Sequence, residues 1–392
     1  MKKWILLLLL VFALGAFAAC GGGDGDTVTL RVGESLGYTE DFIREAGRIF
    51  TERNPHIRVE FVNVEIGQAH TQVALDGPAG VGPDVFAAPH DQLGSLVAGG
   101  LILPARNPAQ VQAQALASTV LAASFDGVLY GYPMSAETYA IFYNRDLIDS
   151  VPGTFAELFD WTIAFNAANP GRFGFLFEPG NAYYTIIFMS QEGNRLFGPH
   201  GTDATTPNVN TPAAISGMEF MRSLRPMLDV PSGDVTTAFV DGAFMAGDVA
   251  MLMSGPWNIG NFLSAGINLG VATIPSLPGE VNPPASFSGT RVMFVSAFTH
   301  HPDEAHMFAE FLMTEEIQRL RYEITQTIPA APIETGNPYF GGFMEQLQFA
   351  VPMPSIPEMG AFWGAMPAAS ANIWDGADIV EQLNMTYTAI RN

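Results

Sequence analysis

Hydrophobic and polar positions near the start of the chain follow first a strand period, then a helix period, then a strand period again. Val28–Val32 is a short apolar and β-branched run, which is typical of a strand. The next apolar residues fall on one helical face, with Thr39 as the expected N-cap and Glu40 and Asp41 in the first turn, where the helix dipole favours acids. Residues 57–61 then alternate apolar and polar, which predicts a second strand.

The same periods continue along the chain. A third strand is predicted at 83–87, followed by a loop at Asp91. Gly127–Pro133 and Thr138–Asn144 are predicted as a hairpin or as a crossing strand. Further elements are predicted at Pro212–Leu224, Val249–Met253, 302–324 and 376–391. Strands that alternate with helices predict an α/β fold with helices on both faces of a parallel sheet. Ligands bind such sheets at the carboxyl ends of strands, so the loop at Asp91 is a candidate binding loop.

Composition narrows the possible functions. The 392 residues suggest two domains, and 29 Phe with 48% hydrophobic residues are enough for packed cores. Asp and Glu number 39 against 17 Lys and Arg, so the net charge is −22. Such a surface repels phosphate backbones and anionic lipid, and we expect no nucleic-acid partner. A single cysteine excludes a disulfide framework and a multi-cysteine metal site.

The first residues have the pattern of a bacterial lipoprotein signal. Lys2 and Lys3 precede the apolar stretch Trp4–Leu14, and mostly small residues lead to Cys20. We predict a signal peptide at 1–19, then a lipidated Cys20 in a flexible tether at 20–26 (CGGGDGD). The alternative, an uncleaved membrane anchor, is disfavoured because the apolar stretch is shorter than the roughly 20 residues that span a bilayer.

Enzyme motifs are mostly missing from the sequence. It contains no GxxxxGK[ST], HExxH, CxxC or GxSxG pattern. His300, His301 and His306 are close together, but three histidines at a helix start more often face solvent than hold a metal, so we expect no metal and no cofactor. Asp91 and Glu137 are the carboxylates that a tethered glycosidase would use, and their separation is not known from sequence.

Four stretches carry a resemblance to a known family. They are Gly82–Asp91, Gly131–Leu147, Ala250–Asn258 and Met353–Trp363. In this order and spacing the chain resembles the extracellular solute-binding proteins of ABC importers. The Met-Pro-x-Ile-Pro…Phe-Trp pattern of the last stretch is similar to the maltose/maltodextrin-binding branch.

The resemblance implies a two-lobed, periplasmic-binding-protein-like α/β fold. Each lobe would hold a mostly parallel sheet flanked by helices, and crossing segments would form a hinge between the lobes. The N-terminal lobe would comprise 27–135 plus 286–328, and the C-terminal lobe 139–283 plus 335–392.

The resemblance also implies the function. The protein would be a non-enzymatic monomer that binds a neutral oligosaccharide, maltodextrin or also cyclodextrin, and delivers it to the permease subunits of an ABC importer. The lipid on Cys20 would hold it at the cell membrane of a Gram-positive bacterium. Another oligosaccharide or a polyol remains an alternative ligand.

Three aromatic residues match stacking positions of the family. They are Trp257, Trp363 and Tyr183, with Tyr184 as the alternative to Tyr183. An aromatic ring suits a sugar because the apolar face of the sugar stacks on it while the hydroxyls reach polar groups.

Polar positions of the family also have counterparts here. Asp91 and Glu137 match carboxylates that accept hydrogen bonds from sugar hydroxyls. Three further positions are matched as ligand contacts: Glu34, Gln92 and Asn181.

Several positions depart from the family pattern. Ala88 stands for a tryptophan, Gln92 for an arginine, Gly364 for a tyrosine and Pro367 for an arginine. If Ala88 leaves space in the cleft, maltotriose or longer or cyclic α-glucans should be preferred over maltose. The alternative is that other residues compensate and restore a maltose site.

Overall fold

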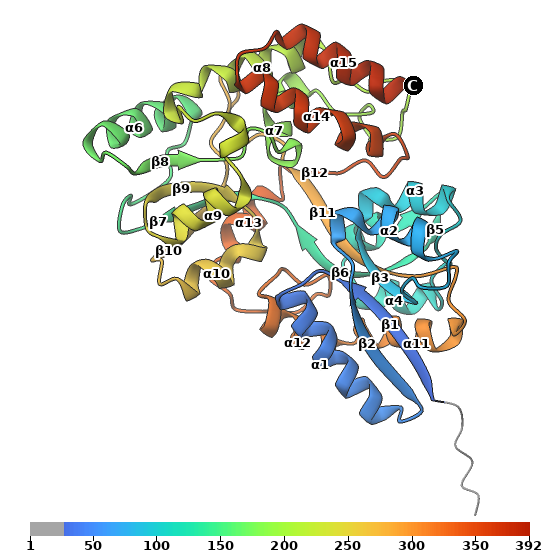
Figure 1. Cartoon of the computed structure of the whole chain (residues 1–392). Helices are drawn as coiled ribbons and strands as arrows, with labels where there is room; N and C mark the ends of the chain where they lie inside the picture. Colours follow the sequence, from blue (N-terminus) through green and yellow to red (C-terminus); the bar gives the residue numbers. More distant parts are fainter. Residues whose placement is uncertain (1–26) are drawn as a thin grey trace, which may run out of the picture.

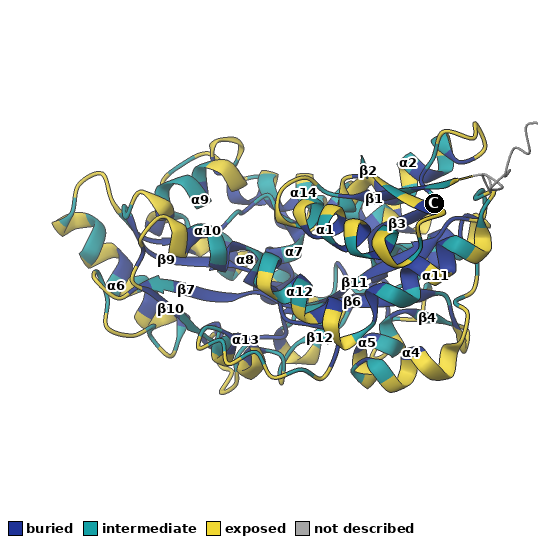
Figure 2. Cartoon of the chain, turned by 90° about the horizontal axis from the view of Figure 1, so that it is seen from below, coloured by how far each residue is buried: buried dark blue, intermediate teal, exposed yellow. Residues whose placement is uncertain are grey.

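The computed structural model describes residues 27–392, which build two lobes around two separate sheets and two hydrophobic cores (Figure 1). We call the part around the six-stranded sheet the first lobe and the part around the four-stranded sheet the second lobe. The strands of both sheets are mostly buried (Figure 2). In the described part of the chain, every helix is too short or too polar to cross a membrane. The predicted signal peptide, Cys20 and the tether up to residue 26 lie outside the described residues.

The first lobe has a mixed sheet in the order β12-β11-β3-β1-β2, with β6 also paired to β11. Strand β1 is parallel to β2 and β3, whereas β11 is antiparallel to β3 and β6. The strands are β1 (Val28–Glu34), β2 (Ile57–Asn63), β3 (Val85–Pro89), β6 (Gly131–Glu137), β11 (Phe287–Val295) and β12 (Val351–Pro352), beside a small hairpin of β4 (Ser124–Phe125) and β5 (Val128–Leu129). The helices are α1 (Tyr38–Arg53), α2 (Ala69–Asp76), α3 (Leu93–Ala98), α4 (Pro108–Gln114), α5 (Ala117–Ala122), α11 (Pro302–Leu312) and α12 (Glu315–Thr325).

The second lobe has a sheet in the order β10-β7-β9-β8. Its strands are β7 (Ala140–Asn144), β8 (Phe173–Leu176), β9 (Val249–Ser254) and β10 (Leu269–Ala272). Its helices are α6 (Phe155–Ala168), α7 (Ala182–Met189), α8 (Pro212–Ser223), α9 (Thr237–Met245), α10 (Ile259–Ser264), α13 (Phe340–Gln346), α14 (Met359–Trp374) and α15 (Ile379–Arg391). The chain passes between the lobes at 137–140, 272–287 and 325–340, and it returns briefly to the first sheet at β12, between α13 and α14.

The predicted two-lobed α/β fold is confirmed, but both sheets are mixed, and the second is mostly antiparallel instead of mostly parallel. In the second sheet only β8 and β9 are parallel, and β7 is antiparallel to β9 and to β10. The reason is that β7 enters this sheet by crossing from β6 of the other lobe, without the helical connection that makes neighbouring strands parallel. Of the two interpretations of 127–144, the crossing strand is therefore correct.

Three local predictions were wrong in detail. The single helix expected at 302–324 is two helices, because Thr314 adopts an extended backbone at the N-cap position of the second helix. Thr39 does not cap α1; Gly37 holds that position with a φ of 87°, and the Thr39 hydroxyl donates to the carbonyl of Ser35. The third strand begins two residues later than expected, at Val85.

Candidate sugar-binding cleft

A cavity of about 700 Å³ lies between the lobes and is lined by residues of both. Its volume falls within the range of about 300–1,000 Å³ that is usual for small-molecule sites. Seven of the eight predicted contact residues line it: Asp91, Gln92, Glu137, Asn181, Tyr183, Trp257 and Trp363. The eighth, Glu34, lies behind the cavity wall.

The second lobe contributes a wall of aromatic rings. The Tyr183 ring centroid lies 6.2 Å from that of Trp257 and 6.3 Å from that of Phe287. Phe287 in turn lies 5.9 Å from Trp363. Trp257 follows strand β9, and its ring lies over Gly255, where an added Cβ would come within 2.1 Å of the ring. A glycine at 255 therefore allows the ring to fold back along the cavity.

Both tyrosines of the 183–184 pair border the cavity, but to different extents. Tyr183 is half-buried, whereas Tyr184 is only 6% exposed. Both pack edge-on against Tyr139, at 4.8 Å and 5.2 Å between ring centroids. Asn181 caps α7, because its side-chain oxygen accepts the backbone N–H of Tyr183. Tyr183 therefore offers the larger ring surface to a ligand.

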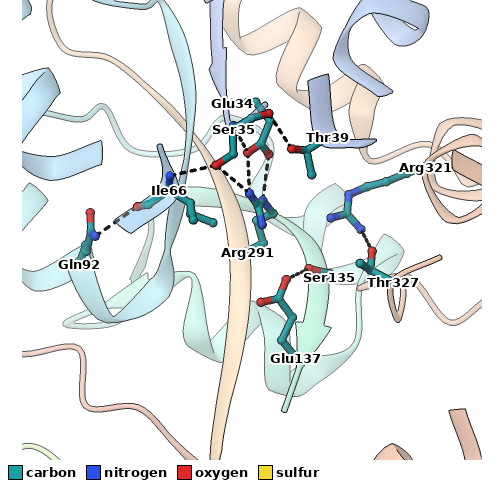
Figure 3. Close-up of polar contacts among 10 residues, drawn as sticks. All are labelled: Glu34, Ser35, Thr39, Ile66, Gln92, Ser135, Glu137, Arg291, Arg321 and Thr327. Carbon is teal, nitrogen blue, oxygen red and sulfur yellow. Dashed lines mark hydrogen bonds and ion pairs between the residues drawn. The ribbon is translucent and has the colours of Figure 1, made fainter. Parts of the chain in front are cut away.

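The first lobe contributes a polar wall centred on a buried ion pair (Figure 3). Arg291 of β11 donates from Nε and Nη2 to the two oxygens of Glu34, at 2.9 Å and 2.7 Å. The two side chains are only 12% and 4% exposed. Burial lowers the pKa of Arg291, but the neighbouring Glu34 carboxylate raises that pKa overall. Arg291 faces the cavity and Glu34 supports it from behind, so the carboxylate of Glu34 is already occupied.

A second guanidinium lies close to this pair. Arg321 of α12 is 3% exposed and donates to the Thr327 hydroxyl at 2.6 Å, while its Nη2 has no partner among the described residues. Burial, and then the positive charge of Arg291, lower the pKa of Arg321 to about 10. Glu137 lines the cavity and accepts a hydrogen bond of 2.7 Å from the Ser135 hydroxyl, which leaves its carboxylate accessible to a ligand (Figure 3).

Asp91 and Gln92 lie at the end of β3, but each already has a partner. The Trp363 indole N–H donates to Asp91 Oδ2 at 2.7 Å. Burial raises the pKa of Asp91 to about 6, an effect that the Trp363 hydrogen bond opposes. The Gln92 amide bridges to the backbone of residues 66–70, accepting from His70 N–H at 3.0 Å and donating to the carbonyls of Ile66 and Gly67.

Sequence reasoning missed several lining residues. Glu178 follows β8, accepts a hydrogen bond of 2.9 Å from Thr237, and has a pKa raised by burial. The strand-end rule that selected Asp91 would also have selected Glu178. Arg291, which also lines the cavity, was missed as well. It directly precedes the apolar run 292–295, and a charge that is buried beside such a run requires a partner. Tyr38 at the start of α1 gave no such signal.

The expectation that Ala88 opens space in the cleft is wrong. Ala88 is fully buried in the first core, lies opposite Val292 in the sheet, and does not line the cavity. Gly364 and Pro367 also lie outside the cavity lining. The small side chain at position 88 therefore does not open space in the cleft, and the expected preference for longer glucans loses its main argument.

The histidines that were considered for a metal site have other surroundings. His306 is buried against the Tyr132 hydroxyl, at 2.8 Å from Nδ1, whereas His300 and His301 border a small surface pocket. Within residues 27–392, no three His, Cys, Asp or Glu side chains are grouped as a metal site requires.

Comparisons with known proteins agree with this geometry. A family profile described as "Bacterial extracellular solute-binding protein" matches residues 45–333. A galactooligosaccharide-binding protein of Bacillus subtilis (strain 168) is 31% identical, over 94% of this chain and 91% of its own. A maltooligosaccharide ABC transporter solute-binding lipoprotein of Streptococcus pneumoniae (strain R6) is 28% identical, over 93% of this chain and 90% of its own. The crystal structure of a cyclo/maltodextrin-binding protein complexed with maltotetraose superposes with a TM-score of 0.78 at 32% identity, covering 95% of this chain and 98% of that one.

Proposed function

The chain belongs to the bacterial extracellular solute-binding protein family, and we propose that it captures neutral maltodextrin-type oligosaccharides in the cleft for an ABC importer. The observation that carries this proposal is the pairing of an aromatic wall with a polar wall across one cavity. A sugar ring needs both, because its faces are apolar and its edges carry hydroxyls. The family assignment confirms the prediction of a solute-binding protein over that of a glycosidase.

In this proposal the rings of Trp257, Tyr183 and Trp363 stack on sugar faces. The half-buried state of all three supports the assignment, since each ring keeps surface toward the cavity while it packs against the second core. Glu137 and Glu178, which also line the cavity, would accept sugar hydroxyls. The lobes would close on the ligand about the crossing segments, as hinged two-lobed proteins do.

We further propose that the mature protein is a monomer anchored to the cell membrane of a Gram-positive bacterium through a lipid on Cys20. The support is the signal pattern before Cys20 together with a pneumococcal relative named as a lipoprotein. The permease subunits of the importer would be its partners. Cys20→Ser should abolish incorporation of labelled fatty acid into the protein; incorporation that persists in this variant would contradict a lipid on Cys20.

Calorimetry against a sugar panel tests the ligand. The panel contains maltose, maltotriose, a cyclodextrin, a galactooligosaccharide and a xylo-oligosaccharide. We expect at least one of the three α-glucans, maltose, maltotriose or the cyclodextrin, to bind. Galactooligosaccharide is the second candidate because the relative named for that sugar is 31% identical to this chain. If only the galactooligosaccharide or the xylo-oligosaccharide binds, the α-glucan assignment is wrong while the solute-binding role stands.

A further inference from the structure

Asp91 and Trp363 both match ligand-contacting positions, yet in the structure they bond to each other. The indole N–H of Trp363 donates to Asp91 Oδ2 at 2.7 Å, between residues 272 positions apart in the sequence. Asp91 lies in a short 3-10 turn, His90–Gln92, which follows β3 of the first lobe. Trp363 lies on α14 and packs against the second core. The bond therefore joins the lobes at the cavity wall.

The carboxylate of Asp91 is covered on both oxygens. The residue is only 5% exposed although it borders the cavity. Oδ2 accepts the indole N–H, and Oδ1 is buried with no hydrogen-bond partner among residues 27–392. To bond to Asp91, a sugar hydroxyl would have to reach Oδ1, which the surrounding atoms cover. The alternative is that it replaces the indole N–H on Oδ2. The arrangement fits a carboxylate that holds the tryptophan better than one that is presented to a ligand.

We propose that Asp91 is a positioning residue, which fixes the Trp363 ring in the cleft wall through its indole N–H. This inference rests on the proposed sugar-binding function. A hydrogen bond to a carboxylate is shorter and stronger than one between neutral groups, so it restricts rotation of the ring effectively. Phe362 and Phe287 support the same ring edge-on, with centroids 5.0 Å and 5.9 Å away. A ring held in this way presents its face to a sugar without losing side-chain entropy on binding.

The turn that carries Asp91 also holds the segment leading into α14. His90 Nε2 lies 3.1 Å from the carbonyl of Met353, and the N–H of Gly94 donates to the carbonyl of Ser355 at 2.9 Å. A Cβ at position 94 would lie 2.1 Å from that carbonyl oxygen, so the two segments meet backbone to backbone. The approach of α14 is therefore set by this turn together with the start of α3, and the turn also orients the tryptophan ring.

A double-mutant cycle on maltotriose affinity, measured by calorimetry, tests the assignment. Trp363→Phe keeps a ring and removes the N–H, and Asp91→Leu removes the acceptor. Each should weaken binding about tenfold, the usual effect of losing one charged hydrogen bond. If Asp91 acts through Trp363, the double variant should bind maltotriose as tightly as the single variant that has the lower affinity. Asp91→Asn, which keeps an oxygen acceptor for the indole, should stay within about threefold of the parent chain.

Trp257→Phe provides the matched control. Its indole makes no side-chain hydrogen bond within the described residues, and it lines the same cavity. When Trp257→Phe is combined with Asp91→Leu, the fold-losses of maltotriose affinity of the two single variants should multiply. Multiplying effects in the Asp91–Trp363 pair, or an Asp91→Asn loss as large as that of Asp91→Leu, would overturn the proposal, because both indicate that the carboxylate contacts the sugar itself.

Failure of the proposed function can be told apart from failure of this inference. If the parent chain does not bind maltotriose, the same cycle is measured on urea unfolding without sugar. Effects on the unfolding midpoint that do not add would support the Asp91–Trp363 coupling even then, and additive effects would overturn it.

Discussion

The two walls of the cavity differ in how their side chains are held. On the first lobe, Nε and Nη2 of Arg291 and the amide of Gln92 are already in hydrogen bonds with other parts of the same lobe. On the second lobe, Trp257 and Tyr183 contribute ring surface, held by packing against a core. Arg291 and Gln92 are thus held as part of the fold, whereas Trp257 and Tyr183, like the accessible carboxylate of Glu137, are mainly surface for a ligand. Changes at Arg291 and Gln92 should lower stability, and changes on the second wall should lower affinity.

The largest effect should come from breaking the buried ion pair of the first wall. Arg291→Met leaves the Glu34 carboxylate, 4% exposed, without its partner. Removing one member of a buried pair typically lowers the free energy of unfolding by about 3–5 kcal/mol. Urea denaturation of the sugar-free chain measures this change.

The control for this variant is an ion pair at the surface. Arg53→Met removes the partner of Glu316, where both side chains are about half exposed, at 49% and 60%. Exposed pairs contribute little, so its denaturation midpoint should stay near that of the parent. The double variant Glu34→Gln/Arg291→Met should recover part of the loss, since no buried charge is left unpaired. Equal losses in the buried and exposed variants would contradict a structural role for the first wall.

The second prediction concerns pH and the carboxylate between the walls. Asp91 has a pKa of about 6 in the folded chain, above the ordinary value of about 3.9. The folded state therefore binds the proton more tightly, and this carboxyl destabilises the fold above pH 6, by up to about 3 kcal/mol. The penalty disappears as pH falls from 6 toward 4. Asp91→Asn has no such penalty, so its stability relative to the parent should be highest above pH 6 and decline toward pH 4.

Its neighbour His90 has the opposite dependence, which makes the test sharper. Burial lowers the pKa of His90 to about 4. The folded state therefore resists protonation of this side chain, and the free energy of unfolding decreases as pH falls from about 6.5 toward 4. His306, with a pKa lowered to about 4 chiefly by burial, adds to this loss. In the parent, the Asp91 penalty disappears over the same pH range, and this offsets part of the loss caused by the two histidines. The thermal unfolding temperature, measured from pH 8 down to pH 4, should therefore fall more steeply in Asp91→Asn than in the parent. Parallel curves would show that Asp91 titrates normally.

The third prediction tests the second wall. Trp257→Ala removes a ring from the cleft and should weaken maltotriose binding by roughly thirtyfold, corresponding to about 2 kcal/mol for a buried aromatic anchor. Calorimetry measures this loss of affinity. The free energy of unfolding should change less than it does in Arg291→Met. Trp161→Ala, on α6 outside the cavity lining, is the tryptophan control and should keep the parent affinity. If Trp257→Ala binds as tightly as the parent, the wall has been assigned to the wrong function.

The difference between the walls also explains what could be predicted from the sequence. Trp257 and Trp363 were predicted because each lies in a stretch that carries the family resemblance, and Tyr183 because its position also matches an aromatic position of the family. The Glu34–Arg291 pair was missed because it joins positions 257 apart, and periodicity describes only neighbouring residues. The same limit led to the wrong expectation for Ala88, since a motif match does not show what covers a small side chain. Element positions were predicted well where a hydrophobic period was strong, and less well where one residue such as Thr314 ends a helix.

The smallest effect should come from Gln92, and it decides whether this residue of the first wall acts only indirectly. Gln92 lines the cavity at a position matched to a ligand contact, but its amide is fully used on the backbone of residues 66–70. Gln92→Ala removes three neutral hydrogen bonds at a partly exposed site, so we expect a loss of about 1 kcal/mol or less in unfolding free energy. Maltotriose affinity should fall no more than about threefold, because the ligand loses only the shape of a loop. Gln92→Glu keeps the acceptor for His70 and removes the two donors, and it should lie between the parent and the alanine variant. A thirtyfold loss of affinity in Gln92→Ala with unchanged stability would show that the amide leaves the loop and bonds to the sugar. Gln92 would then bind the ligand directly, as Glu137 is proposed to do, and its contrast with the aromatic wall would no longer hold.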